Sequence, residues 1–235
     1  MIDHPWNAAP APGTTIEVAA GIRWVRMPLP FALDHINLWL LEDGDGWVVV
    51  DTGVGLAETR ELWERIFATE LGGRPVTRVV VTHFHPDHMG NAGWLTQRWG
   101  VEVWCTQAEY LFAHLAHRAS TAEDFAPRLE HYRRNGCDEA ALARLARRGN
   151  HYPGLVPSVP REHRRLRDGD VLTIGGRRWR ALETIKARRQ RGPGARGMSP
   201  KLTGFGHLIG MRPVSTAHRF TIVLRRSAAI KTVPT

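Results

Sequence analysis

Short apolar runs dominate the first eighty residues and predict a sheet. The runs are rich in Val, Ile, Leu and Trp and are bounded by Gly, Pro and Asp, which is typical of strands. Five strands are expected, at residues 15–20, 22–27, 36–41, 47–50 and 76–81. Apolar residues at helical spacing predict a helix over 56–71, which would join the last two of these strands. The sequence Asp-Gly-Asp-Gly at 43–46 predicts a hairpin turn between the third and fourth.

The rest of the pattern changes from one βαβ unit to helices and then back to strands. Pro86 suits the first position of a helix, which is expected to run to about Trp99 and to be followed by a strand at 101–104. A strand, a helix and a strand in succession predict parallel or mixed pairing in this part of the sheet. Helical segments are expected at 108–118, 122–134 and 138–148, then a proline-rich connector at 152–160, then strands at 163–167, 171–174 and 178–183.

Four potential metal ligands lie within six residues, directly after the strand at 76–81. They are His83, His85, Asp87 and His88, in the stretch Thr82–Gly90. Open α/β sheets place ligand sites at the carboxyl ends of their strands. Because residues two apart on an extended chain point the same way, His83 and His85 can bind one ion, and Asp87 and His88 can reach a second. Imidazole and carboxylate ligands suit zinc, with manganese and iron as the alternatives, and a histidine-rich turn without metal is the competing interpretation.

This His-x-His-x-Asp-His motif resembles the metallo-β-lactamase-fold hydrolases, a superfamily that includes glyoxalase II-like thioesterases, lactonases and some ribonucleases. The opening strands resemble the first sheet of that fold, and Asp51-Thr52-Gly53 stands where an Asp-x-Gly is typical. The hairpin sequence at 168–176 resembles the start of the second half. The resemblance implies an α/β fold, an αββα sandwich of the metallo-β-lactamase type, of which the second half is incomplete in this chain.

The same resemblance implies metal-assisted hydrolysis. In the family pattern two zinc ions are bound, and a metal-bound hydroxide attacks the carbonyl or phosphoryl centre of the substrate. By this resemblance His83 and His85 hold the first ion and Asp87 and His88 the second, and Asp87 also acts as the catalytic group that orients the water and receives its proton. Asp51 either orients the histidines from behind or simply forms a turn. The substrate class is left open between thioesters, lactones, other esters and phosphodiesters.

The length of 235 residues allows one or two domains, and three segments are expected. Residues 1–14 read as a flexible arm, and residues 15–185 as the metallo-β-lactamase-like domain. The helical segment 107–150 reads as an insertion placed to form a lid or one wall of the substrate cleft. Residues 186–235 read as a basic tail of doubtful structure.

The charge distribution supports a boundary near residue 185. The chain has a net charge of +9, yet residues 1–183 hold 21 of its 32 Lys and Arg and all 23 of its Asp and Glu. No carboxylate that could bridge two metal ions is therefore present after residue 183. His207, in a Gly-x-Gly-His turn, is a weak candidate for the third ligand of the first ion, with a chance turn as the alternative, and His218 has no supporting context. A change of reading frame or an aberrant gene end would produce such a segment, and a genuine basic tail that binds RNA or anionic surfaces is the rival hypothesis.

Three functions therefore compete. The first is a zinc hydrolase of a small-molecule or phosphodiester substrate. The second is an impaired or truncated family member with a partial metal site. The third function, which is not favoured, is that of a nucleic-acid-binding protein that uses the basic tail. No apolar run is long enough to span a membrane, which takes about 18 residues. Two distant cysteines, Cys105 and Cys137, predict a reduced, cytoplasmic protein. The sequence gives no indication of the oligomeric state.

Overall fold

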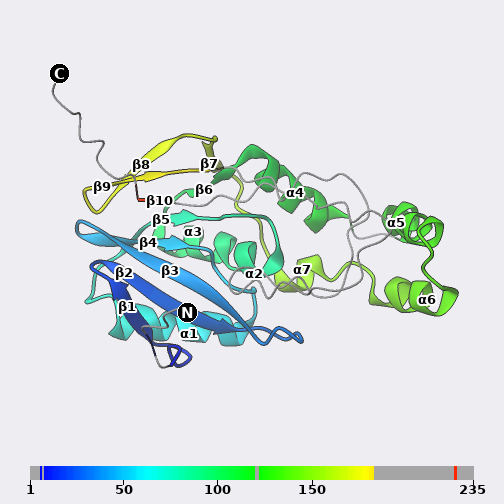
Figure 1. Ribbon diagram of the computed structural model, residues 1–235, viewed down its shortest axis with the longest axis horizontal. Coiled ribbons are helices and arrows are strands. Elements are labelled where there is room, and N and C mark those ends of the chain that lie inside the picture. Colours follow the sequence, from blue (N-terminus) through cyan, green and yellow to red (C-terminus); the bar gives the residue numbers. More distant parts are fainter. Residues whose placement is uncertain (1–5, 7, 120–121, 183–224, 227–235) are drawn as a thin grey trace, which may run out of the picture.

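A seven-stranded mixed sheet forms the centre of the molecule (Figure 1). The computed structural model describes residues 6, 8–119, 122–182 and 225–226. In space the strands follow their order in the chain. They are β1 (Thr15–Ala19), β2 (Ile22–Pro28), β3 (His35–Asp43), β4 (Gly46–Val50), β5 (Val76–Val80), β6 (Val103–Thr106) and β7 (His163–Leu166). The α/β class predicted from the sequence is confirmed.

Strand direction changes at β4, as the predicted βαβ unit requires. The strands β1 to β4 pair antiparallel, whereas β4, β5, β6 and β7 pair parallel. Val50 lies opposite Val80 at the carboxyl ends of β4 and β5. The residues that follow these two strands are therefore brought side by side at one edge of the sheet.

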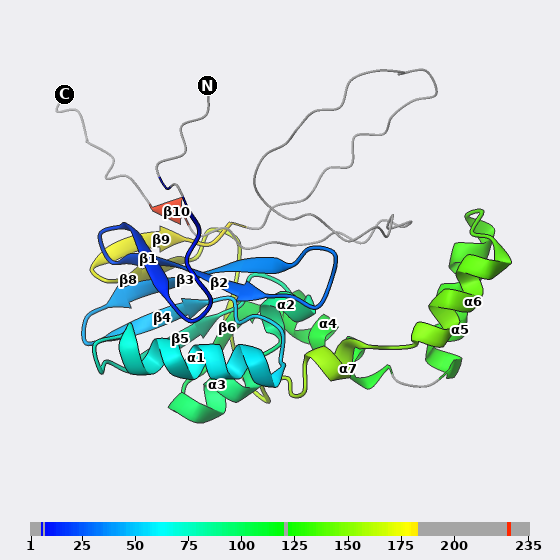
Figure 2. The same cartoon turned by 90° about the horizontal axis from the view of Figure 1, so that it is seen from below.

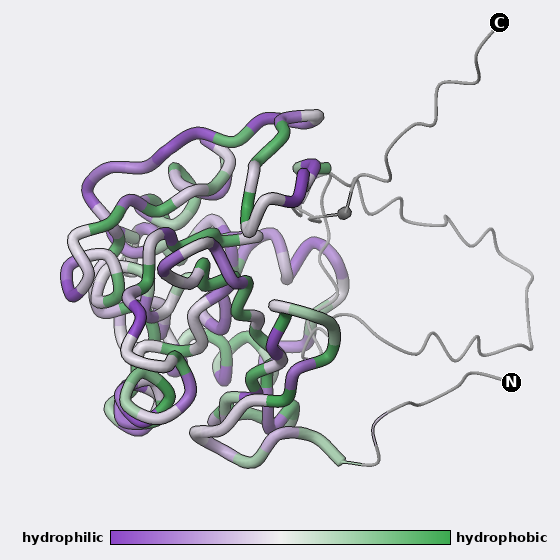
Figure 3. The backbone as a smooth tube through the Cα atoms, turned by 90° about the vertical axis from the view of Figure 1, so that its left-hand side faces the viewer, coloured by the Kyte–Doolittle hydropathy of each residue, from purple (hydrophilic) through white to green (hydrophobic). Residues whose placement is uncertain are grey.

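Helices cover one face of this sheet and a second, smaller sheet lies on the other (Figure 2). Helix α1 (Ala57–Thr69) turns Trp63, Ile66 and Phe67 towards the first face, where they pack with Leu95 of helix α3 (Ala92–Trp99). The second sheet contains β8 (Val171–Ile174), β9 (Arg177–Arg180) and β10 (Arg225–Arg226). Leu172, Ile174 and Trp179 of that sheet pack on side chains of β3, β4 and β5. Two apolar cores therefore enclose the central sheet, and Figure 3 shows hydrophobic and hydrophilic stretches alternating along the chain that builds them.

The helix predicted from Pro86 to Trp99 is divided in two. Helix α2 (Pro86–Met89) ends at Gly90, and α3 begins after Asn91. Asn91 is fully buried, and its side-chain amide donates to the carbonyl oxygens of Thr52 (3.2 Å) and Val54 (2.6 Å). These tertiary hydrogen bonds hold Asn91 out of helical geometry, so the single predicted helix is wrong at this point.

The helical segment after β6 comprises α4 (Gln107–Arg118), α5 (Ala122–Arg134) and α6 (Glu139–Arg148). Helices α5 and α6 pack on each other and stand apart from the body of the molecule, at the far right of Figure 2. A short helix, α7 (Tyr152–Leu155), replaces part of the predicted proline-rich connector, because Tyr152 and Leu155 are buried against the body. The predicted boundaries of the arm, domain, insertion and tail stay predictions.

Substitution of Asp138 is expected to loosen the α5–α6 hairpin. The Asp138 carboxylate accepts a hydrogen bond of 2.6 Å from the backbone amide of Ala141 and so caps the first turn of α6. Asp138→Ala should lower the free energy of unfolding by about 1 kcal/mol, the usual effect of losing an N-cap. Urea denaturation can measure this loss. Asp138→Asn keeps a capping oxygen and should lie close to the parent protein, and equal stability of the alanine variant would contradict the capping role.

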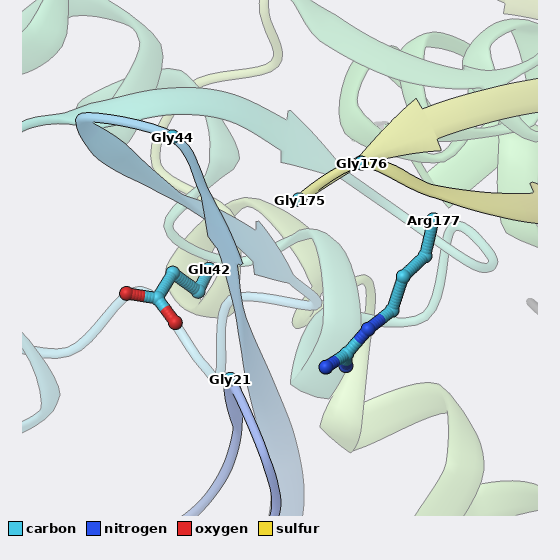
Figure 4. A pocket seen from close by; sticks show the side chains of 6 residues that line it. All are labelled: Gly21, Glu42, Gly44, Gly175, Gly176 and Arg177. Carbon is cyan, nitrogen blue, oxygen red and sulfur yellow. The ribbon is translucent and has the colours of Figure 1, made fainter.

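A shallow cavity of about 350 Å³ opens among three turns of the two sheets (Figure 4). Glu42, Arg177 and four glycines line it. It lies beside the β3–β4 turn, at the amino end of β4, whereas the ligand motif follows the carboxyl end of the parallel strand β5. The cavity is therefore at the opposite edge of the sheet from the motif and is separate from the candidate site.

In the described ranges, no helix has both the length and the apolar character needed to cross a membrane.

Candidate metal centre

The ligand motif lies where two parallel strands end together. The amide of Asp51, the residue after β4, donates to the carbonyl of Val80, the last residue of β5, at 2.8 Å. Asp51 therefore comes beside Thr82, although 31 residues separate them in sequence. This placement agrees with the general position of ligand sites in open α/β sheets, at the carboxyl ends of the strands.

Asp51 is a buried carboxylate with three partners. It accepts hydrogen bonds from the Thr82 amide (2.8 Å), from the Thr82 hydroxyl and from His88 Nδ1 (2.7 Å). Its φ angle is +62°, a left-handed conformation that only one non-glycine residue adopts in the described part of the chain. Such conformations cost about 1–3 kcal/mol and persist where surrounding contacts impose them. Asp51 is thus held in place from both its backbone and its side chain.

The four motif side chains form two close pairs. His83 Nε2 lies 3.1 Å from His85 Nδ1, and His88 Nε2 lies 3.3 Å from Asp87 Oδ2. The imidazole rings of His83 and His88 connect the pairs, with 3.8 Å between their centroids. The assignment of the two alternating histidines to one ion and of the Asp-His dipeptide to a second stays a prediction.

Charge is divided unevenly among these groups. Burial works against a charge on His88, but the Asp51 carboxylate outweighs it and raises the pKa of His88 to about 10. Burial, together with the positive charge of His88, lowers the pKa of His83 to about 3. Burial opposes ionisation of both aspartates, yet contact with His88 lowers the pKa of Asp51 and brings that of Asp87 to about 2. At neutral pH an imidazolium therefore lies between two carboxylates.

The loop after β4 is joined to the motif by backbone and side-chain contacts. The Thr52 amide and hydroxyl donate to the carbonyl of His88 at 2.9 and 2.7 Å. A Cβ placed on Gly90 would lie 2.4 Å from the carbonyl oxygen of Gly53 and 2.5 Å from the amide of Gly55. The two segments therefore touch through their main chains, and a glycine is required at position 90.

The donor atoms of the motif are of the types that bind metal ions in proteins. His88 donates from Nδ1 to a buried carboxylate and leaves Nε2 on the side of Asp87, which is the usual arrangement of a histidine that ligates through one nitrogen and is oriented through the other. Imidazole nitrogens and a carboxylate suit zinc. Among the described residues, however, no three His, Cys, Asp or Glu side chains converge on a single point. The motif therefore supplies pairs of donors, and complete coordination of a metal ion needs ligands in addition to these four residues.

The structure brings together five of the residues singled out in the sequence, namely His83, His85, Asp87, His88 and Asp51. His207 and His218 lie outside the described residues. Sequence reasoning missed Thr82, whose hydroxyl bonds to Asp51, and Glu109, whose carboxylate accepts from the amide of Phe84. Thr82 adjoins the motif and could have been suspected. Glu109 is 25 residues from its partner on a different element, and no local pattern indicates the contact.

The chain belongs to the metallo-beta-lactamase superfamily. The sequence model of that superfamily matches residues 32–184, and the resemblance inferred from the motif is confirmed. The residues matched run from the strand β3 to the end of the hairpin β8–β9, so they contain both Asp51 and the four motif ligands. Metal-ion binding is a property of this superfamily.

Solved structures agree with this assignment. A beta-lactamase domain protein from Burkholderia ambifaria is 47% identical, with a TM-score of 0.68 over 76% of this chain and 52% of its own. The metallo-beta-lactamase family protein TTHA1429 from Thermus thermophilus is 27% identical, with a TM-score of 0.54 over 72% of this chain and 53% of its own. The predicted metallo-β-lactamase-type fold is confirmed.

A curated relative extends the comparison to function. The probable metallo-hydrolase YqjP of Bacillus subtilis (strain 168) is 35% identical over 78 residues, which are 33% of this chain and 23% of that protein. The chain thus spans about half the length of the two solved relatives and a smaller part of the curated one.

Proposed function

We propose that this protein is a metal-dependent hydrolase in which His83, His85, Asp87 and His88 hold the metal. One observation carries the proposal: the buried Asp51 carboxylate binds His88 Nδ1 at 2.7 Å and leaves His88 Nε2 beside Asp87. A histidine in a turn without metal has no need of a buried carboxylate behind it, because burying that charge costs free energy. Superfamily membership supports the same conclusion.

The residues of the chain divide the work between binding and proton transfer. The two paired histidines would hold one ion, and the Asp87–His88 pair would hold a second. Zinc, when bound, acts as a Lewis acid that lowers the pKa of a water molecule towards neutrality. Asp87 is ionised at neutral pH, so its oxygens would be able to accept a hydrogen bond from a water at this site, orient it and receive its proton. Asp51 accepts the Nδ1 proton of His88, so Nε2 would be the nitrogen that gives up its proton and binds the metal.

The proposed substrates contain an electrophilic carbonyl or phosphoryl centre. A thioester, a lactone, another ester and a phosphodiester all meet this requirement, because the four motif residues act on the attacking water and do not bind the rest of the substrate. Metal-dependent turnover should be measured with one compound of each class. Asp87→Asn keeps the size of the side chain and should abolish turnover of whichever class is hydrolysed, whereas turnover that survives this substitution would exclude the assigned role of Asp87.

The metal content of the purified protein tests the proposal directly. After reconstitution with zinc and removal of excess metal, elemental analysis should find close to two ions per chain. The double variant His83→Ala/His85→Ala should lose about one of them. His151→Ala removes an exposed histidine at the start of α7 and should bind as much metal as the parent.

A metal content near zero in the parent protein would overturn the hydrolase proposal and favour a family member with a partial site. Nucleic-acid binding through residues 186–235 stays a prediction, since all but Arg225 and Arg226 lie outside the described residues. It requires that deletion of this segment abolishes RNA binding.

A further inference from the structure

We propose that Glu109 and Tyr152 are positioning residues that hold the backbone of Phe84 at its amide and at its carbonyl and so keep His83 and His85 close together. Phe84 is the residue between the two histidines, and its amide donates to Glu109 Oε2 at 2.7 Å. The hydroxyl of Tyr152 donates to its carbonyl oxygen at 2.5 Å. The inference rests on the proposed function, because it concerns two of the proposed metal ligands.

Both partners come from separate elements that are fixed in the core. Glu109 lies in the first turn of α4 and is 3% exposed, and Tyr152 lies at the start of α7 and is 6% exposed. Helices α4 and α7 pack against each other. The Phe84 ring packs between them, 5.6 Å from the ring of Phe112 and 6.2 Å from that of Tyr152. The peptide and the side chain of Phe84 are thus both held by these two helices.

The backbone of Phe84 determines how the two histidines are placed relative to each other. His83 and His85 lie directly before and after Phe84, where the chain bends, so the backbone torsion angles of Phe84 set the relative placement of the two side chains. A rotation about the backbone bonds of Phe84 would therefore change the separation of His83 Nε2 and His85 Nδ1, which lie 3.1 Å apart here. Hydrogen bonds at the amide and at the carbonyl of Phe84 together prevent such a rotation.

The choice of a carboxylate as the partner supports a positioning role. Burying a charged group costs free energy, and a neutral acceptor would satisfy one amide. The positive end of the α4 dipole and the Phe84 amide both stabilise the Glu109 carboxylate, and the bond that results is stronger than one between neutral groups. Burial, with a smaller contribution from the nearby Glu109, raises the pKa of Tyr152, so its hydroxyl stays protonated as a donor.

Removal of one hydroxyl group tests the proposal. Tyr152→Phe keeps the ring and loses the bond to the Phe84 carbonyl. Tyr110→Phe is the matched control, because the Tyr110 hydroxyl donates at the same distance of 2.5 Å to a backbone carbonyl, that of Arg161, which is remote from the motif in sequence. Tyr152→Phe should weaken zinc binding about tenfold or more, as for other groups that orient metal ligands, and should shift the visible absorption bands of the cobalt-substituted protein. Tyr110→Phe should change neither.

Glu109 provides a second pair of variants. Glu109→Gln keeps an acceptor oxygen and should retain most of the affinity for zinc, whereas Glu109→Leu removes the acceptor and should resemble Tyr152→Phe. If the Glu109 side chain merely filled space, Glu109→Leu would retain the affinity for zinc as well as Glu109→Gln does. Equal zinc affinities and equal cobalt spectra for Tyr152→Phe and Tyr110→Phe would overturn the proposal, even if the Glu109 variants failed to fold.

Metal-free protein separates this proposal from the proposed function. If the parent binds no zinc, the hydrolase proposal fails, but the histidine rings can still be followed by NMR of protein labelled with nitrogen-15 in histidine. Tyr152→Phe should then shift the ring signals of His83 and His85, and Tyr110→Phe should leave them unchanged. Unchanged signals in both variants would exclude a positioning role irrespective of metal binding.

Discussion

Asp51→Ala is expected to lower the free energy of unfolding of the metal-free protein by about 3–5 kcal/mol, the usual effect of removing one partner of a buried ion pair. The substitution leaves the charged His88 without its main counter-ion and removes the acceptor of the Thr82 amide and hydroxyl. Alanine is also disfavoured at the φ angle of +62° that residue 51 adopts. Urea denaturation in the presence of a chelator would measure the loss without a contribution from bound metal.

Two further variants separate the causes of this loss. Asn tolerates the left-handed conformation and still offers an oxygen to Thr82, so Asp51→Asn isolates the lost charge and should be less destabilising than alanine. Asp45→Ala removes an exposed aspartate from the β3–β4 turn, at the other end of β4, and should change stability by less than about 0.5 kcal/mol, as most surface substitutions do. A loss for Asp51→Ala no larger than that for Asp45→Ala would contradict the importance assigned to the His88–Asp51 pair.

Gly90→Ala is the second substitution with a large expected effect. The added methyl group would lie within 2.5 Å of the Gly53 carbonyl oxygen, the Gly55 amide and the Pro86 carbonyl oxygen. Backbone atoms cannot rotate away, so the loop after β4 and the motif must separate. Overpacking of this kind costs about 1–3 kcal/mol, and the upper end is expected here because all three contacts are with main-chain atoms. Thermal or urea unfolding would measure the cost.

Gly154→Ala is the matched control for that experiment. Gly154 lies in α7, and a Cβ there would meet no atom within 4 Å. Its replacement should be neutral or slightly stabilising, because alanine restricts the unfolded chain more than glycine does. Since the two loops also carry Asp51 and His88, Gly90→Ala should reduce zinc binding as well, and Gly154→Ala should not. A stable Gly90→Ala protein with unchanged zinc binding would disprove the close contact between the loops.

The parts of the fold that the sequence predicts well are those fixed by local pattern. The strands from residue 15 to residue 81, the hairpin turn at 43–46 and the helix 56–71 all appear close to their expected positions. The ligand motif is likewise local, because four donors within six residues need only a strand end and a turn to come together. Period and spacing are sufficient for such features, since neighbouring residues determine them.

The features that could not be predicted depend on contacts between distant segments. The break at Asn91 arises from hydrogen bonds to Thr52 and Val54, 39 and 37 residues away in sequence. The contact of Tyr152 with Phe84 spans 68 residues and comes from a helix where a connector was expected. Such contacts form only when the chain is folded, so the residues next to either partner in the sequence do not indicate them.

The parallel register of β4 and β5 determines how accurately the candidate centre is built. Asp51 and the motif reach each other because Val50 lies opposite Val80, and a slip of one residue would displace Asp51 by about 3.3 Å and turn its side chain to the other face. That register is maintained by valines such as Val49 and Val79, which are fully buried in the core beneath the helices. Hydrophobic packing remote from the candidate ligands therefore determines how precisely Asp51 and the motif are positioned relative to each other.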